Sequence, residues 1–177
     1  MVLHFWKAGR ILSPLSETFG AAVLLSAESA LILFTVIARL VRGHISVFEE
    51  TLAAACLVSM CAYLINDHVL KVFFGVPNPI NVLRGATHGF HFWMGSDNSG
   101  FPSGHMVLAG AFAGVFMRLY KASIWPLSAL LLLAAGLLLV GGWHFLSDVI
   151  AGAYLGTSAG ILGGAGWAAY SGRQSKG

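Results

Sequence analysis

The chain of 177 residues is too apolar for a soluble domain: 57% of its residues are hydrophobic, 10% are charged, and its mean hydropathy is +0.79. We therefore expect an integral membrane protein. The formal net charge of +3 is better explained by basic flanks of membrane segments than by a nucleic-acid surface, so nucleic acid is excluded as a partner.

Five apolar segments are each long enough to cross a bilayer core of about 30 Å. The expected spans are residues 19–40, 48–74, 102–120, 124–142 and 144–170. Short turns join most of them, so consecutive helices should run antiparallel in one bundle. The sequence predicts an all-α fold, an integral membrane bundle of about five transmembrane helices that forms a single domain over residues 1–177.

Two segments outside the spans differ in composition. Residues 1–16 contain Lys7 and Arg10 with two aromatic residues but no continuous apolar run. This composition predicts a short interfacial segment and no cleavable signal peptide. Residues 77–101 form a long connection rich in Pro, Gly, Asn and aromatic residues, which is typical of a lid or a binding element.

Basic residues near the ends of the spans predict the orientation of the bundle. If the spans alternate in direction, one side carries Arg39, Arg42, Arg118, Lys121, Arg173 and Lys176. The other side carries Lys7, Arg10, Lys71 and Arg84. The more basic side should be cytoplasmic. We therefore expect a protein of the bacterial inner membrane in which Lys71, His105 and His144 share the periplasmic or other extracytoplasmic face.

Two histidines at the starts of different spans are the strongest signal of chemistry. Pro102-Ser103-Gly104-His105 opens the third expected span, where free backbone N–H groups and the positive end of the helix dipole attract an anion such as phosphate. His144 and Asp148 lie four apart at the start of the last span, so the carboxylate can orient the imidazole and stabilise its charged form. Together these groups favour phosphoryl transfer through a histidine nucleophile.

Glycines follow this polar pair at every fourth position of the last span: Gly152, Gly156, Gly160 and Gly164. They form an inclined ridge on which another helix could pack closely. Gly110 and Gly114 have the same spacing in the third span. Two interpretations stay open: the two ridges meet, or glycine is simply common in membrane helices.

Other polar residues have a functional and a structural interpretation. For Glu28, in the middle of the first span, we prefer a structural hydrogen bond to Ser or Thr of another helix. Asp67 could pair with Lys71, four residues on, and position it, or could be a helix-end charge. The His88-x-x-His91 pair in the long loop has no third ligand at a supporting spacing, so we expect no metal site.

These motifs resemble those of the type 2 phosphatidic acid phosphatase superfamily, a group of membrane lipid phosphatases. Pro102-Ser103-Gly104-His105 is similar to the second motif of the family, and the segment containing His144 and Asp148 is similar to the third. Lys71 and Pro79 match the first motif, Lys-x6-Arg-Pro, in type and spacing.

The resemblance, which covers about residues 68–156, implies a role for each catalytic residue. His144 would be the nucleophile that forms a phosphohistidine, and Asp148 would orient it and stabilise its positive charge. His105 would protonate the leaving alkoxide and then activate the hydrolytic water. The resemblance implies neither a metal ion nor another cofactor.

The resemblance also implies a phosphate site made by Lys71, Ser103 and the backbone N–H of Gly104. Two arginines of the family pattern are absent: Asn78 replaces the Arg of the first motif, and Leu138 stands where the third motif has its Arg. Loss of one such donor can cost a factor of about 10² to 10³ in rate.

Three explanations for these replacements stay open. Arg84, in the long loop on the same side, could bind the phosphate from a different position. The substrate could carry less charge at phosphorus, as a phosphodiester does. That would fit a lipid headgroup phosphotransferase, and sphingolipid synthases are similar in keeping a His-His-Asp set without the Arg of the third motif. The third explanation is a weaker enzyme or a catalytically inactive membrane helper.

We expect a metal-independent lipid phosphatase that hydrolyses a phosphomonoester or pyrophosphate at the outer membrane face. Its partners would be membrane lipids and a phospholipid or isoprenoid phosphate substrate. The motifs favour no particular lipid and no particular oligomeric state.

Overall fold

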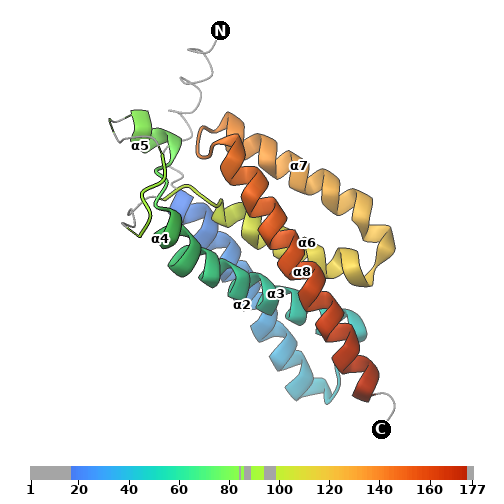
Figure 1. Cartoon of the computed structure of the whole chain (residues 1–177). Helices are drawn as coiled ribbons and strands as arrows, with labels where there is room; N and C mark the ends of the chain where they lie inside the picture. Colours follow the sequence, from blue (N-terminus) through green and yellow to red (C-terminus); the bar gives the residue numbers. More distant parts are fainter. Residues whose placement is uncertain (1–16, 84, 86–88, 94–98, 175–177) are drawn as a thin grey trace.

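The computed structural model describes residues 17–83, 85, 89–93 and 99–174, and the regular elements in these parts are all helices (Figure 1). The helices are α2 (Glu17–Arg42), α3 (Val47–Ile65), the π-helical turn η1 (Asn66–Leu70), α4 (Lys71–Phe74), α5 (Pro79–Leu83), α6 (Gly104–Leu119), the 3-10 turn η2 (Lys121–Ser123), α7 (Ile124–Val140) and α8 (Leu146–Gln174). The expected interfacial segment 1–16 lies outside the described residues.

The predicted all-α membrane bundle is confirmed. Among the described residues, four stretches are long and apolar enough to cross a membrane: Gly20–Arg42, Val47–Phe74, Lys121–Val140 and Leu146–Gly172. The remaining expected span is the shorter helix α6, whose 16 residues extend only about 24 Å. Large apolar side chains are exposed along the long helices, as expected of a surface that faces lipid.

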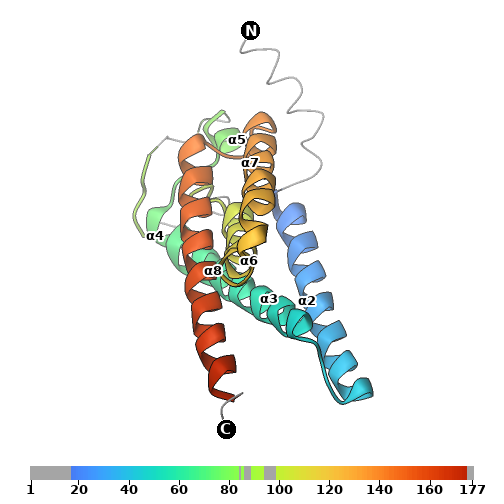
Figure 2. The same ribbon diagram turned by 90° about the vertical axis from the view of Figure 1, so that its right-hand side faces the viewer.

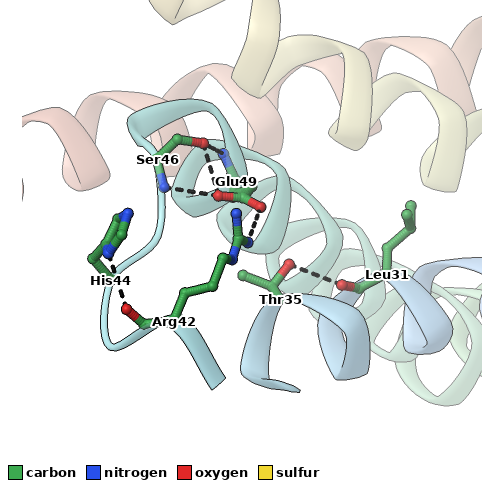
Figure 3. A network of polar contacts seen from close by, with 6 residues as sticks. All are labelled: Leu31, Thr35, Arg42, His44, Ser46 and Glu49. Carbon is green, nitrogen blue, oxygen red and sulfur yellow. Dashed lines mark hydrogen bonds and ion pairs between the residues drawn. The ribbon is translucent and has the colours of Figure 1, made fainter. Parts of the chain in front are cut away.

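The turn between α2 and α3 is fixed by local polar contacts (Figure 3). The hydroxyl of Ser46 accepts the backbone N–H of Glu49 at 3.2 Å, and the Glu49 carboxylate accepts the backbone N–H of Ser46 at 2.8 Å. This capping box starts α3, and the Glu49 carboxylate also pairs with Arg42 in the last turn of α2. Nδ1 of His44 lies 3.0 Å from the Arg42 carbonyl oxygen.

Glu28 forms the structural hydrogen bond that we preferred from the sequence. The hydroxyl of Ser59, on α3, donates to Oε1 of Glu28 at 2.8 Å. The same hydroxyl lies 2.9 Å from the carbonyl oxygen of Leu108 on α6. Glu28 therefore contributes to a buried polar contact that links α2, α3 and α6.

The closest helix pair is α6 with α8, and glycines make the approach possible. A Cβ atom at Gly156 would overlap the carbonyl oxygen of Val107, and one at Gly160 would overlap that of Ala111. Gly114 of α6 meets the backbone of α8 in the same way. The two glycine ridges predicted from the sequence therefore do meet.

The pairs of residues in contact also show that α6 and α8 run in the same direction. Four residues along α8, from Gly156 to Gly160, correspond to four residues along α6 in the same direction, from Val107 to Ala111. The two helices are therefore parallel. In the chain, α7 connects the end of α6 to the start of α8, and it lies at the edge of the bundle (Figure 1). Their N-terminal ends lie toward the part of the bundle that carries α5, whereas the α2–α3 turn and the last turns of α8 lie at the opposite end (Figure 2).

We predict that Gly160→Ala separates α6 from α8 and lowers the free energy of unfolding by about 1–3 kcal/mol, the usual cost of overpacking. Gly166→Ala is the matched control, because a Cβ there has no neighbour within 4 Å and alanine favours the helix. Denaturant unfolding in detergent followed by circular dichroism measures both. Equal midpoints for the two variants would contradict the close-packing account.

Candidate active site

The Pro-Ser-Gly-His turn begins α6, as the sequence predicts. Ser103 is the N-cap, and its hydroxyl accepts the backbone N–H of Met106 at 3.5 Å. The backbone N–H of Ser103 donates to the carbonyl oxygen of Asp148 at 3.0 Å. Gly152 permits this contact, because a Cβ there would lie 2.5 Å from the Ser103 carbonyl oxygen. The start of α6 is therefore attached directly to the first turn of α8.

His144 and Asp148 form a buried pair, with 3% and 0% of their surfaces exposed. Nδ1 of His144 lies 3.6 Å from Oδ2 of Asp148. The last helix begins at Leu146, so His144 precedes the helix on which we expected it. The pair is preserved because Oδ2 accepts the backbone N–H of Phe145 at 2.8 Å and Oδ1 accepts the hydroxyl of Ser147 at 3.2 Å. These bonds orient the carboxylate beside the imidazole.

His105, in the first turn of α6, lies close to His144. The centroids of the two imidazole rings are 6.1 Å apart with an interplanar angle of 71°, and the Trp143 ring lies 6.3 Å from the His105 ring. Neither ring nitrogen of His105 has a hydrogen-bond partner within the described part of the chain. A Cβ at Gly20 would lie 2.5 Å from Nε2 of His105, so α2 closes this side of the ring.

Lys71 reaches the start of α6 from the α3–α4 helix. A Cβ at Gly104 would lie 3.6 Å from Nζ of Lys71 and 2.9 Å from Cε2 of Tyr63. Nζ also lies 3.1 Å from Oδ1 of Asp67, which is the pairing considered from the sequence. An ammonium group and the free N–H groups of a helix start thus lie close together, and both favour an anion.

Asn66 is a neighbour of the site that the sequence analysis missed. It is 1% exposed, and its Nδ2 donates to the carbonyl oxygen of Pro102 at 3.2 Å. Asn66 begins the π-helical turn, in which the N–H of Lys71 bonds to the Asn66 carbonyl oxygen. Residues five apart on an α-helix point about 140° away from each other, and the wider π turn reduces this angle. Both side chains can therefore face the start of α6.

Leu138 occupies the position of the third-motif arginine, and its surroundings are hydrophobic. Leu138, on α7, is 5% exposed and forms a hydrophobic cluster with Met106 and Val149. An unpaired charge in such a cluster would be costly. The structure thus supplies no phosphate ligand from position 138.

Asn78, at the position of the first-motif arginine, lies near the site, but its side chain bonds to the first turn of α5. Its Oδ1 accepts the backbone N–H of Asn81 at 2.9 Å in the first turn of α5. A Cβ at Gly100 would lie 3.0 Å from the Cα of Asn78 and 3.3 Å from Oδ2 of Asp148. Arg84, the predicted substitute, lies outside the described residues.

His91 is the one histidine of the long loop that falls within the described residues. His88 lies outside the described residues, and Nδ1 of His91 lies 3.3 Å from the carbonyl oxygen of Gly75. In the described ranges, no three His, Cys, Asp or Glu side chains are grouped to hold a metal ion.

Comparison with known proteins gives one family match, to the PAP2 superfamily over residues 51–169. No curated protein and no solved structure gives a significant match. The matched segment contains Lys71, the start of α6 and the His144–Asp148 pair, and family membership supports phosphatase activity on phosphate esters. Because the match covers about two thirds of the chain, the protein belongs to the PAP2 superfamily, the type 2 phosphatidic acid phosphatases.

Proposed function

We propose that the protein is a membrane lipid phosphate phosphatase that hydrolyses a phosphomonoester or pyrophosphate through a phosphohistidine at His144. One observation carries the proposal: Lys71 and the His144–Asp148 pair lie close to the first turn of α6, which carries His105. The long apolar helices support a substrate that is supplied by the membrane.

The proposed reaction has two steps. In the first, Nε2 of His144 attacks phosphorus and the bond from phosphorus to the leaving oxygen breaks, while His105 gives a proton to that oxygen. Asp148 offsets the positive charge of the phosphorylated imidazole. In the second step, His105 takes a proton from water, whose oxygen attacks phosphorus. The bond from phosphorus to Nε2 of His144 breaks, which releases inorganic phosphate and restores the free imidazole. The scheme needs no metal ion and no other cofactor.

The phosphate oxygens would be held by Lys71 and by the Gly104 N–H, with the Ser103 hydroxyl beside them. Asp67 shares the ammonium group of Lys71 in the structure, so a phosphate would compete with Asp67 for it. Arg84, in the long loop, remains the proposed second cation.

The orientation follows from the loop charges. The cytoplasmic side would hold the α2–α3 turn, with Arg39 and Arg42, and the α6–α7 connection, with Arg118 and Lys121. The site lies at the opposite end of α6 from that connection. We therefore propose an active site on the extracytoplasmic side, the periplasmic side if the membrane is a bacterial inner membrane.

We predict that His144→Ala lowers the rate of inorganic phosphate release by a factor of about 10⁴ or more, as removal of a nucleophile does elsewhere. The purified protein would be assayed in mixed micelles with a panel of phosphatidic acid, phosphatidylglycerophosphate and isoprenoid pyrophosphate. His44→Ala is the matched control, because it removes a histidine of the α2–α3 turn (Figure 3), which lies at the opposite end of the bundle (Figure 2). An unchanged rate in His144→Ala would refute the proposed function.

The replaced arginines favour a second candidate, a lipid headgroup phosphotransferase. Position 138 is apolar and Asn78 caps α5, so the site has less positive charge than the family pattern, which suits a phosphodiester. The same assay separates the two candidates. Hydrolysis releases phosphate without an acceptor, whereas transfer moves a headgroup to a second lipid only when an alcohol acceptor is added.

We further propose that Asn66 is a positioning residue, because it holds the peptide that precedes the Ser103–Gly104 turn. Asn66→Leu should lower kcat about tenfold with little change in KM, because an unmade buried hydrogen bond costs about 1–3 kcal/mol. Thr35→Val is the control, since it removes a hydrogen bond to the Leu31 carbonyl oxygen far from the site (Figure 3). A loss of stability with unchanged kcat would reduce Asn66 to a structural role.

A further inference from the structure

Six aromatic side chains gather where α4 ends, and we call them the aromatic platform: Phe73, Phe74, Phe90, Phe92, Trp93 and Phe101. We propose that this platform inserts into the interface of the lipid bilayer beside the catalytic end of the bundle. There it would hold the site at the depth of the lipid headgroups. The proposal goes beyond hydrolysis, because it assigns a membrane-binding surface.

The rings of the platform pack on one another in edge-to-face and stacked pairs. The Phe74 centroid lies 5.0 Å from that of Phe101 and 5.9 Å from that of Phe90. The Phe90 and Phe92 rings are stacked 5.6 Å apart. Offset and edge-to-face pairs of this kind are favourable beyond the area they bury, so the platform is a preformed surface.

Backbone contacts fix the loop to the end of α4. The N–H groups of His91 and Trp93 donate to the carbonyl oxygens of Phe74 and Phe73, at 3.1 and 3.0 Å. Gly75, with a φ of 57°, lets the His91 carbonyl come close. Trp93 has a φ of 61°, a conformation that a bulky residue adopts only where its surroundings require it.

Despite this packing, three rings of the platform remain largely exposed. Phe90 is 56% exposed, Phe92 53% and Trp93 70%. Three large apolar rings in one patch are typical of an interaction surface rather than of a surface left in water. The fixed backbone therefore presents apolar rings outward instead of burying them.

The bilayer is the partner that the surroundings of the platform favour. The helix that ends in Phe73 and Phe74 is long and apolar enough to cross a membrane. Its side chains of Ile65, Val69 and Val72 are exposed just before that end, so the platform continues a lipid-facing surface. Aromatic residues, Trp above all, prefer the boundary between headgroups and acyl chains. Helix α4, on which the platform is built, lies at the side of the bundle (Figure 1).

The platform is also joined to the catalytic end. Phe101 directly precedes Pro102, and Phe74 lies three residues after Lys71. The hydroxyl of Ser99 lies 3.2 Å from the Lys71 carbonyl oxygen. The segments that carry the platform therefore also position Lys71 and the start of α6, so the depth of the platform in the membrane would fix the depth of the phosphate site.

Tryptophan fluorescence tests the membrane contact without using catalysis. The protein would be reconstituted in phosphatidylcholine vesicles, and the emission of Trp93→Phe would be subtracted from that of the wild type. We expect a blue-shifted difference spectrum that lipids brominated near the headgroup quench. A difference spectrum quenched by aqueous iodide, and not by brominated lipid, would overturn the proposal whatever the enzyme does.

A kinetic test, which rests on the proposed function, uses the double variant Phe92→Ser, Trp93→Ser. Phosphate release from phosphatidic acid in vesicles, relative to a short-chain soluble analogue, should fall about tenfold, because burial of an aromatic side chain contributes at least that factor. Trp125→Ser is the matched control. Trp125 is 83% exposed but lies in the first turn of α7, beside the α6–α7 connection and away from the start of α6. An equal fall in the control, or no fall in the double variant, would contradict a special role for the platform.

Discussion

The close approach of α6 and α8 is the constraint on which the site depends. Gly152, Gly156 and Gly160 let the backbone of α8 touch that of α6, and the register makes the two helices parallel. Parallel helices bring two N-terminal ends to the same end of the bundle, so motifs about forty residues apart become neighbours. The bond from the Ser103 N–H to the Asp148 carbonyl oxygen completes this contact at the point where the chemistry is proposed.

Within the described part of the chain, few cations lie at the site. Lys71 is the ammonium that the structure places at the start of α6, and Asp67 lies within ion-pair distance of it. In the proposed site, backbone N–H groups at the helix start would add a dipolar attraction for the phosphate. Binding at such a site depends on the positions of the donor groups more than on net charge. The π-helical turn lets Asn66 and Lys71 both face the start of α6, so the proposed mechanism depends on it.

Much of this arrangement could be predicted from the sequence, because it depends on strong local patterns. Apolar length located the spans. A spacing of four residues raised the glycine contact and the Asp67–Lys71 pair as one of two alternatives each, and the structure contains both contacts. The hydrogen bond of Glu28 to a hydroxyl of another helix was predicted for the same reason, the high cost of an unpaired polar group in a membrane.

What the sequence did not predict depends on contacts between distant segments. The π-helical turn has no local signature, and the role of Asn66 appears only once Pro102 is placed beside it. His144 was expected on the last helix, but the helix begins at Leu146 after a turn in which Gly142 has a φ of 70°. The aromatic platform likewise forms only when the long loop folds back onto α4.

The central claim, that His144 carries the phosphoryl group, is tested most directly by trapping the covalent intermediate. The enzyme would be mixed with a lipid substrate labelled with radioactive phosphorus, quenched in alkali within one turnover and analysed by peptide mass spectrometry. The account predicts an acid-labile, alkali-stable phosphohistidine on the peptide that contains His144, and none in His144→Ala. Label on another residue, or release of phosphate by His144→Ala at the wild-type rate, would contradict it.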